Sequence, residues 1–258
     1  MTAEQHLAGP PSVTDGAALA GRRITKTFGP VTALDSVTFS AKYGRVLALL
    51  GDNGAGKTTL IKILCGVLQP DSGELLMDGA VIRFRTPAEA RRSGIATVFQ
   101  DLAVCDLLSI TRNIVLGNEP RVRFGPLALY NAAEADRIAR EALSRLGARM
   151  DRDLSSYART LSGGERQALA IARAMYYGSK CLILDEPTAS LAARQANGVL
   201  THVRAAADAG QAVILITHNY AQALSVADDI VILAHGSVAG AFRAGEITAE
   251  DVMTLVAR

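Results

Sequence analysis

The sequence lacks any long hydrophobic segment. Its longest uninterrupted apolar runs, such as Val46–Leu50 and Ala212–Ile216, contain five residues, whereas a membrane-spanning helix needs about 20 predominantly apolar residues. The first residues include Glu4 and no apolar stretch, so we expect no secretory signal. We therefore expect a soluble, cytoplasmic protein that works at a membrane only through a partner.

An excess of one charge is also missing. Lysine and arginine number 27 against 25 acidic residues, a net charge of +2, which argues against nucleic acid as the main partner. The three cysteines, Cys65, Cys105 and Cys181, form no CxxC pair, so we expect reduced thiols. Of the 258 residues, 49% are hydrophobic, which is enough to build a core, and this length predicts one large domain or two small ones.

The order of apolar segments predicts an α/β fold. Residues 1–20 lack periodicity and are expected to form a flexible leader before a single domain at 21–258. Runs typical of buried strands occupy Arg45–Leu50, Cys181–Leu184 and Ala212–Thr217, with shorter β-like stretches at Ile24–Phe28, Ser36–Phe39, Ala96–Phe99 and Ile230–Phe242. Helical spacing occurs at Leu60–Leu64, Ala132–Leu146, Leu161–Tyr177 and Ala249–Val256. Strands that alternate with helices in this way predict a parallel sheet.

A glycine-rich segment follows the first buried strand. Gly51–Thr58 reads Gly-Asp-Asn-Gly-Ala-Gly-Lys-Thr and matches the phosphate-binding pattern G-x-x-x-x-G-K-[ST], with a strand before it and a helix after it. Glycines let backbone N–H groups turn toward a polyphosphate, and the helix directs its positive end at the same anion. Lys57 can reach the β- and γ-phosphates, and Thr58 can offer its hydroxyl to Mg²⁺.

A pair of carboxylates ends a second buried strand. Asp185 and Glu186 follow Cys181–Leu184, at the carboxyl edge of the sheet where ligands bind in open α/β folds. Asp185 is expected to hold Mg²⁺ through water, and Glu186 to accept the proton of an attacking water molecule. Taken alone, the pair is equally consistent with an ordinary turn. The phosphate loop upstream favours a functional site instead.

Three further features are ambiguous when taken singly. His218 ends an apolar run, as a strand cap would, and Gln100 fits an ordinary polar strand end. The segment Leu161–Gln167, Leu-Ser-Gly-Gly-Glu-Arg-Gln, is either a second anion site at a helix start or a flexible helix cap.

Together, in this order and at these separations, the five features resemble the nucleotide-binding subunits of ABC transporters. The resemblance covers about residues 22–240, and Leu161–Gln167 makes it specific. It implies a P-loop NTPase ATP-binding domain with a RecA-like parallel-sheet core, an N-terminal antiparallel β subdomain and a helical insertion at about 101–178. It also implies ATP and Mg²⁺ as cofactors, and two copies that face each other head to tail.

The resemblance assigns roles to individual residues. The residues expected to contact ATP are Phe28 against adenine, then Gly51, Asp52, Asn53, Gly54, Ala55, Gly56, Lys57, Thr58 and Thr59, and from the second copy Ser162, Gly163 and Gly164. The expected Mg²⁺ residues are Thr58, Gln100 and Asp185, and the catalytic residues are Glu186, His218 and Gln100. One position departs from the family, because Ala192 stands where an aspartate usually couples the two sites.

Finer features resemble importers of the ribose and fructose type. These are Asp52 in the phosphate loop, the segment Thr97–Ala103 and the segment Met175–Lys180, and a chain with one ATP-binding unit is similar to the fructose-import member. The resemblance implies separate integral membrane permease subunits, an indirect solute-binding protein and a place at the cytoplasmic face of the membrane. The candidates for the permease contact are Leu107, Leu108, Ser109, Ile110 and Arg112–Gly117, with ordinary core packing as the alternative.

Other functions stay open at this point. An ABC ATPase of lipoprotein or lipid export differs only near Gln100, and a weakly active nucleotide-binding regulator is suggested by Ala192. An ABC ATPase of DNA repair is disfavoured because the sequence between Lys57 and Leu161 has no sustained heptads.

Overall fold

The computed structural model describes residues 16–124, 127–148, 152–177 and 179–257 of the chain. Its centre is a six-stranded sheet in the order β12-β11-β3-β10-β9-β6, parallel except for β12. The strands are β3 (Val46–Leu50), β6 (Ile95–Val98), β9 (Cys181–Asp185), β10 (Ala212–Thr217), β11 (Asp229–Ala234) and β12 (Ser237–Arg243). The parallel sheet expected from the sequence is therefore present.

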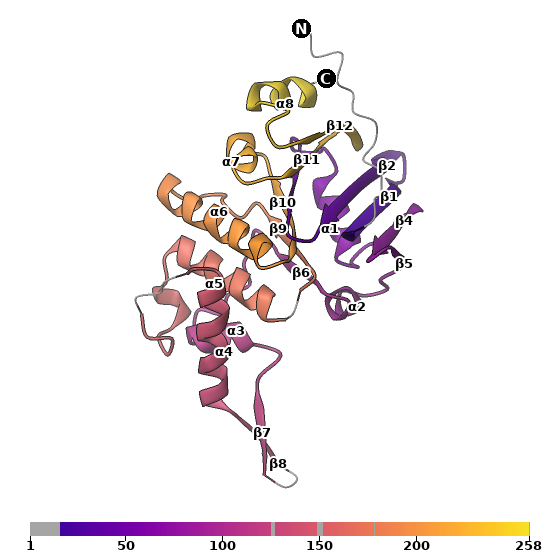
Figure 1. The fold of residues 1–258 in the computed structure, drawn as a ribbon. Coiled ribbons are helices and arrows are strands. Elements are labelled where there is room, and N and C mark those ends of the chain that lie inside the picture. Colours follow the sequence, from indigo (N-terminus) through magenta and orange to yellow (C-terminus); the bar gives the residue numbers. More distant parts are fainter. Residues whose placement is uncertain (1–15, 125–126, 149–151, 178, 258) are drawn as a thin grey trace.

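Two further layers cover the central sheet, an antiparallel sheet over one face and helices over the other (Figure 1). An antiparallel sheet lies on one side, in the order β2-β1-β4-β5, with β1 (Ala17–Phe28), β2 (Val31–Lys42), β4 (Ser72–Met77) and β5 (Ala80–Ile82). The remaining helices outside the insertion are α1 (Lys57–Leu64), α2 (Pro87–Arg92), α6 (Ala193–Asp208), α7 (Tyr220–Leu224) and α8 (Ala249–Val256). Among the described residues, no helix has the length and apolar content that crossing a bilayer requires.

The strand β3 separates two hydrophobic cores. Leu47 and Leu49 pack in the core that contains α1 and the antiparallel sheet, whereas Val46, Ala48 and Leu50 pack in the core beneath α5 and α6. Successive side chains of a strand point to opposite faces. An uninterrupted apolar run is therefore what a strand covered on both faces requires.

A helical insertion between β6 and β9 extends away from the sheet (Figure 1). It contains α3 (Ile110–Val115), the hairpin of β7 (Arg121–Phe124) and β8 (Leu127–Tyr130), α4 (Ala132–Arg145), a 3-10 turn at Ala158–Thr160 and α5 (Gly163–Tyr176). The side chain of Asn131 caps α4 by accepting from the Glu134 N–H. The helices expected at 132–146 and 161–177 are confirmed, with ends that differ by one or two residues.

The expected leader is wrong at its carboxyl end. Residues Ala17–Ala20 belong to β1 and are buried, Ala18 and Leu19 completely. Because alanine is small, this stretch shows no alternation of large apolar and polar side chains, although it packs fully inside the molecule. The rest of the expected leader, residues 1–15, lies outside the described residues.

Candidate active site

The phosphate loop connects β3 to α1, in a conformation that depends on its glycines. Gly51, Gly54 and Gly56 have positive φ angles of 152°, 87° and 99°. A Cβ on Gly51 would collide with the carbonyl oxygen of Leu233, and one on Gly56 with that of Ala33. The outer side of the loop is thus closed by neighbouring backbone, so a side chain at either glycine would displace it.

The start of α1 carries uncompensated N–H groups. Its N-cap is Gly56, no side chain caps it, and its first turn contains no acidic residue. The first N–H groups of a helix have no partner within the helix, and the helix dipole adds positive potential there. This arrangement is suited to an anion with several oxygens, such as a polyphosphate.

Lys57 bends back over the loop. Its Nζ donates to the carbonyl oxygens of Gly51 at 2.7 Å and Asp52 at 2.9 Å, and the residue is buried. Burial lowers the pKa of Lys57, while the negative charges of Glu186, Asp52 and Asp185 oppose that shift. The lysine therefore lies close to both carboxylates at the end of β9, as the sequence predicts.

A contact that sequence reasoning missed holds the loop from outside. The hydroxyl of Tyr220 donates to Oδ1 of Asp52 at 2.7 Å, and burial together with this bond raises the pKa of Tyr220. Tyr220 is the first residue of α7, two positions after His218. The bond thus joins the phosphate loop to the segment that follows β10, and only the proximity of Tyr220 to His218 in the sequence could have indicated it.

The two carboxylates end β9 in different environments. Burial raises the pKa of Asp185, the charge of Glu186 adds to the shift, and Lys57 opposes it. Glu186 has a φ of 50°, in the left-handed region that is uncommon for residues other than glycine. Such backbone conformations cluster at functional sites, where the surrounding structure holds them in place.

Glu186 and His218 lie in contact. Oε1 of Glu186 lies 2.7 Å from Nδ1 of His218 and accepts from the backbone N–H of His218 at 3.1 Å. Its Oε2 accepts from the hydroxyl of Thr217 at 3.0 Å. The parallel pairing of β9 with β10 brings these residues together. A carboxylate fixed in this way can accept a proton from a water molecule placed before it.

The remaining candidates lie around this edge. Gln100 is exposed and comes two residues after Val98, which pairs with Leu184 of β9, so it follows β6 at the same edge of the sheet. Phe28 ends β1 with 47% of its surface exposed, and the Nζ of Lys26 lies 5.7 Å from the centre of its ring. Its ring is therefore free to stack against a flat ligand.

The glycine-rich segment at Ser162 lies elsewhere. It begins α5, which packs in the core on the opposite face of the central sheet from α1. Ser162 and Glu165 form a capping box, in which the Ser162 N–H donates to Oε2 of Glu165 at 2.7 Å. Ser162, Gly163 and Gly164 are thus grouped together, at the start of a helix that packs on the other face of the sheet from α1.

The sequence of residues 34–189 matches the family described as ABC transporter. The chain belongs to the ABC transporter family. Its ABC fold carries the phosphate loop, the carboxylate pair and the second glycine-rich segment, and the chain is an ABC ATPase.

Relatives of this ABC ATPase include sugar import proteins. The chain is 42% identical to a fructose import ATP-binding protein of Rhizobium meliloti, over 83% of this chain and 84% of the relative. It is 40% identical to a xylose/arabinose import ATP-binding protein of Sulfolobus acidocaldarius, over 90% of each chain. A ribose import ATP-binding protein of Rubrobacter xylanophilus is 40% identical over 92% of this chain, which spans only 46% of that protein.

Solved structures of ABC cassettes share the fold. The ADP conformation of an ATP-binding cassette of an ABC transporter has a TM-score of 0.77 at 24% identity, covering 93% of this chain and 95% of that one. A dimeric bacterial ABC transporter cassette has a TM-score of 0.71 at 23% identity, covering 89% of this chain and 100% of that one. At these identities the likeness concerns the fold alone.

Proposed function

We propose that this ABC ATPase energises the import of a monosaccharide through separate membrane subunits. The observation that carries the proposal is the match to fructose and xylose/arabinose import proteins over more than four fifths of each chain. Fructose is the first sugar to test, with xylose, arabinose and ribose beside it. The same relatives do not favour the alternative of lipoprotein or lipid export.

ATP binds across the phosphate loop in this proposal. Lys57 exchanges the carbonyl oxygens of Gly51 and Asp52 for the β- and γ-phosphates, and the open N–H groups of α1 hold the same anion. The exposed ring of Phe28 stacks on adenine. The loop residues in contact with ATP are Gly51, Asp52, Asn53, Gly54, Ala55, Gly56, Lys57, Thr58 and Thr59.

Three residues near the carboxyl edge of the sheet would hold Mg²⁺ beside the phosphates. The residues that would hold it are Thr58, Gln100 and Asp185, a hydroxyl, an amide and one carboxylate. Mg²⁺ prefers oxygen ligands and is commonly bound through one or two carboxylates together with substrate phosphates and water, which fits this donor set. The ion would neutralise charge that develops on the transferred phosphoryl group.

Hydrolysis uses the group formed by Glu186, His218 and Gln100. Glu186 accepts the proton of the attacking water, and its contacts with Thr217 and His218 orient the carboxylate. His218 turns its exposed ring toward the γ-phosphate, and Gln100 positions the water and senses the membrane subunit. Each role depends on position at one sheet edge, where all three residues end parallel strands.

A second copy of the chain completes the site. Within one chain, Ser162, Gly163 and Gly164 begin a helix that packs on the opposite face of the sheet from α1, which supports a role at another copy's nucleotide. Two copies placed head to tail bring each segment to the other copy's ATP. Ala192 lies beside this interface, and its missing carboxylate weakens coupling between the two sites rather than ATP binding.

The membrane partners are integral permease subunits at the cytoplasmic face, with a solute-binding protein acting indirectly. Of the candidate contact residues at 107–117, Ile110, Ile114 and Val115 are buried core, whereas Leu107 is 70% and Leu116 39% exposed. We therefore restrict the permease contact to the exposed members of this segment. Nucleic acid has no part in the proposal.

The proposal is tested by deleting the gene and measuring uptake of labelled fructose, xylose, arabinose and ribose. We expect uptake of one sugar to fall to background, to return with the wild-type chain, and not to return with Glu186→Gln. Normal uptake of all four sugars in the deletion strain would overturn the import proposal while leaving the ATPase itself intact.

A further inference from the structure

The β7–β8 hairpin is a two-sided ribbon. Its register pairs Val122 with Leu129, Arg121 with Tyr130 and Arg123 with Ala128. Because paired residues share a face and alternate along each strand, Val122, Leu127 and Leu129 lie on one face, opposite the two arginines. One face is thus apolar and the other basic.

Both faces of the ribbon are open to solvent. Val122, Leu127 and Leu129 are 38%, 64% and 52% exposed, and both arginines are exposed. In the part of the chain that the structure describes, β7 and β8 pair only with each other. An isolated two-stranded hairpin is marginally stable in water, so an exposed apolar face of this kind needs a partner surface.

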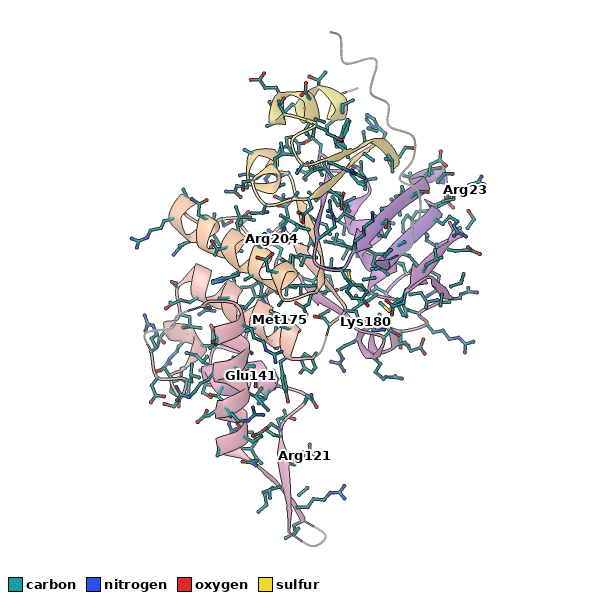
Figure 2. The ribbon with its side chains drawn as sticks, in the orientation of Figure 1. Arg23, Arg121, Glu141, Met175, Lys180 and Arg204 are labelled. Atoms are coloured by element: carbon teal, nitrogen blue, oxygen red, sulfur yellow. The ribbon has the colours of Figure 1, made fainter. Side chains whose placement is uncertain are left out.

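The stem of the hairpin is held firmly against the helical insertion. The hydroxyl of Tyr176 donates to the carbonyl oxygen of Asn118 at 3.0 Å, and that of Tyr177 donates to the carbonyl oxygen of Leu116. At the other strand, the guanidinium of Arg112 lies 5.0 Å from the ring centre of Tyr130. The hairpin is therefore presented by fixed contacts at its base and extends beyond the body of the protein, as Arg121 does in Figure 2.

The hairpin extends from the helical insertion to the lower end of the molecule, with α2 nearer the middle of the view (Figure 1). Between α2 and α5 lies a pocket of about 380 Å³ lined by Arg91, Phe99, Arg173 and Tyr177 among others. Phe99 precedes Gln100, the residue that senses the membrane subunit in the proposed function, and Tyr177 also holds the hairpin stem. The hairpin is thus continuous with the side of the protein that faces the membrane in that proposal.

The positive charge of the hairpin favours a lipid surface over a protein as its binding partner. No carboxylate of the described residues forms an ion pair with Arg121 or Arg123, or with Arg91 and Arg92 of α2. Short cytoplasmic loops of membrane proteins carry an excess of lysine and arginine, which makes them poor partners for Arg121 and Arg123. The cytoplasmic leaflet, by contrast, is negatively charged and attracts basic segments.

We propose that the β7–β8 hairpin binds the anionic lipid surface beside the permease, resting on the proposed function for its orientation. Val122, Leu127 and Leu129 enter the boundary between headgroups and acyl chains, and Arg121 and Arg123 contact lipid phosphates. An amphipathic element binds such a surface with its apolar face buried at that boundary, while the basic residues of its other face contact anionic headgroups. The contact is weak by itself and orients a subunit that its permease already holds nearby.

The test is sedimentation of the purified full chain with vesicles of phosphatidylcholine, alone or mixed with phosphatidylglycerol. We expect binding only to the anionic vesicles. Arg121→Glu/Arg123→Glu should lower the apparent lipid affinity by roughly tenfold or more, since each basic residue contributes about fivefold. Val122→Ser/Leu129→Ser should lower it by a few-fold.

Matched controls separate the site from general charge. Arg23→Glu/Arg243→Glu makes the same change in net charge at exposed positions outside the hairpin and should bind vesicles like wild type. ATP hydrolysis by every variant serves as the check on folding, because the hairpin lies outside the nucleotide site. An equal loss in this control pair would reduce the effect to net charge and overturn the proposal.

Two results would also overturn the lipid contact. One is a wild-type chain that ignores anionic vesicles. The other is a pair of hairpin variants that bind vesicles normally but fail to bind the solubilised permease, which would assign the hairpin to a protein partner. Neither result depends on sugar uptake, so failure of this proposal and failure of the import proposal are distinguishable.

Discussion

The starts of α1 and α5 are similar in sequence and opposite in construction. Both follow or contain glycines, and both are expected to hold an anion. Gly56 caps α1 without a side chain and leaves its first N–H groups open. Ser162 and Glu165 close α5 with a capping box, so the same groups are already partly satisfied and an acidic residue occupies the first turn.

This difference supports our proposal that the phosphate loop binds an anion within one chain, whereas the start of α5 does so only with a second copy. A capping box stabilises a helix start by roughly 1 kcal/mol, which is small beside the interaction of several N–H groups with a charged phosphate. The cap thus keeps α5 stable in a single chain and can be replaced by a ligand that a second copy brings. At the phosphate loop the only exchange in our proposal is made by Lys57, which leaves the carbonyl oxygens of Gly51 and Asp52 for the phosphates.

The largest expected effect comes from blocking α5 without touching α1. Ser162→Arg should reduce ATP hydrolysis to background, because the longer side chain occupies the space of the other copy's phosphates. Binding of ATP to a single chain should stay within about twofold of wild type, since α5 packs on the other face of the sheet from α1. Equilibrium binding of a fluorescent ATP analogue and phosphate release measure the two quantities.

A nearby serine provides the control for that substitution. Ser155 is exposed in the loop before α5, so Ser155→Arg adds the same side chain outside the proposed interface and should hydrolyse ATP normally. Unchanged hydrolysis in Ser162→Arg would contradict the shared site and leave α5 with a structural cap only.

The second largest expected effect is on ATP turnover at the site beside the phosphate loop and α1. Glu186→Gln removes the proton acceptor while keeping the size of the side chain, so turnover should fall by a factor on the order of 10² or more. ATP affinity should be kept, and a dimer should accumulate on size exclusion in the presence of ATP. Glu141→Gln, in a surface ion-pair group on α4, is the control. Wild-type turnover in Glu186→Gln would show that another group accepts the proton.

The parts of the molecule that could be predicted from the sequence are those marked by a single local pattern. Apolar runs predicted the central strands β3, β9, β10 and β11, and the phosphate loop was recognisable because its glycines are required at fixed positions. The hairpin at 121–130 was missed although Arg121–Phe124 alternates in polarity, since four residues are too few to separate a strand from a loop. The Tyr220–Asp52 contact was missed because the two residues are 168 positions apart.

Removing the Tyr220–Asp52 hydrogen bond should have a smaller effect, on ATP binding at the phosphate loop. Tyr220→Phe removes the only hydroxyl on Asp52 among the described contacts, which loosens the loop and should weaken ATP binding by about three- to tenfold. Hydrolysis at saturating ATP should stay near wild type, so KM rises while kcat holds. Tyr43→Phe is the matched control, because Tyr43 donates to Asp78 at the same 2.7 Å far from the loop. Equal effects in both variants would assign the Tyr220 bond to general stability.

The smallest expected effect is on stability and comes from a substitution at a third helix start, that of α6. Ala192 caps α6 without a side-chain bond, yet its φ of −63° and ψ of 151° nearly match the −67° and 165° of Ser162. Ala192→Asp can therefore cap α6 without moving the backbone. It should stabilise the fold by about 1 kcal/mol and raise Tm by about 2–4 °C, with hydrolysis equal to wild type or higher.

Asparagine separates the two consequences of this change. Ala192→Asn restores the cap without the charge, so it should raise Tm like Ala192→Asp, whereas only the carboxylate can restore coupling across a dimer. We therefore expect any gain in hydrolysis, and any rise in the Hill coefficient for ATP, in Ala192→Asp alone. A clear loss of hydrolysis in Ala192→Asp would mean that the interface has adapted to alanine. The two active sites would then be coupled through contacts other than this position.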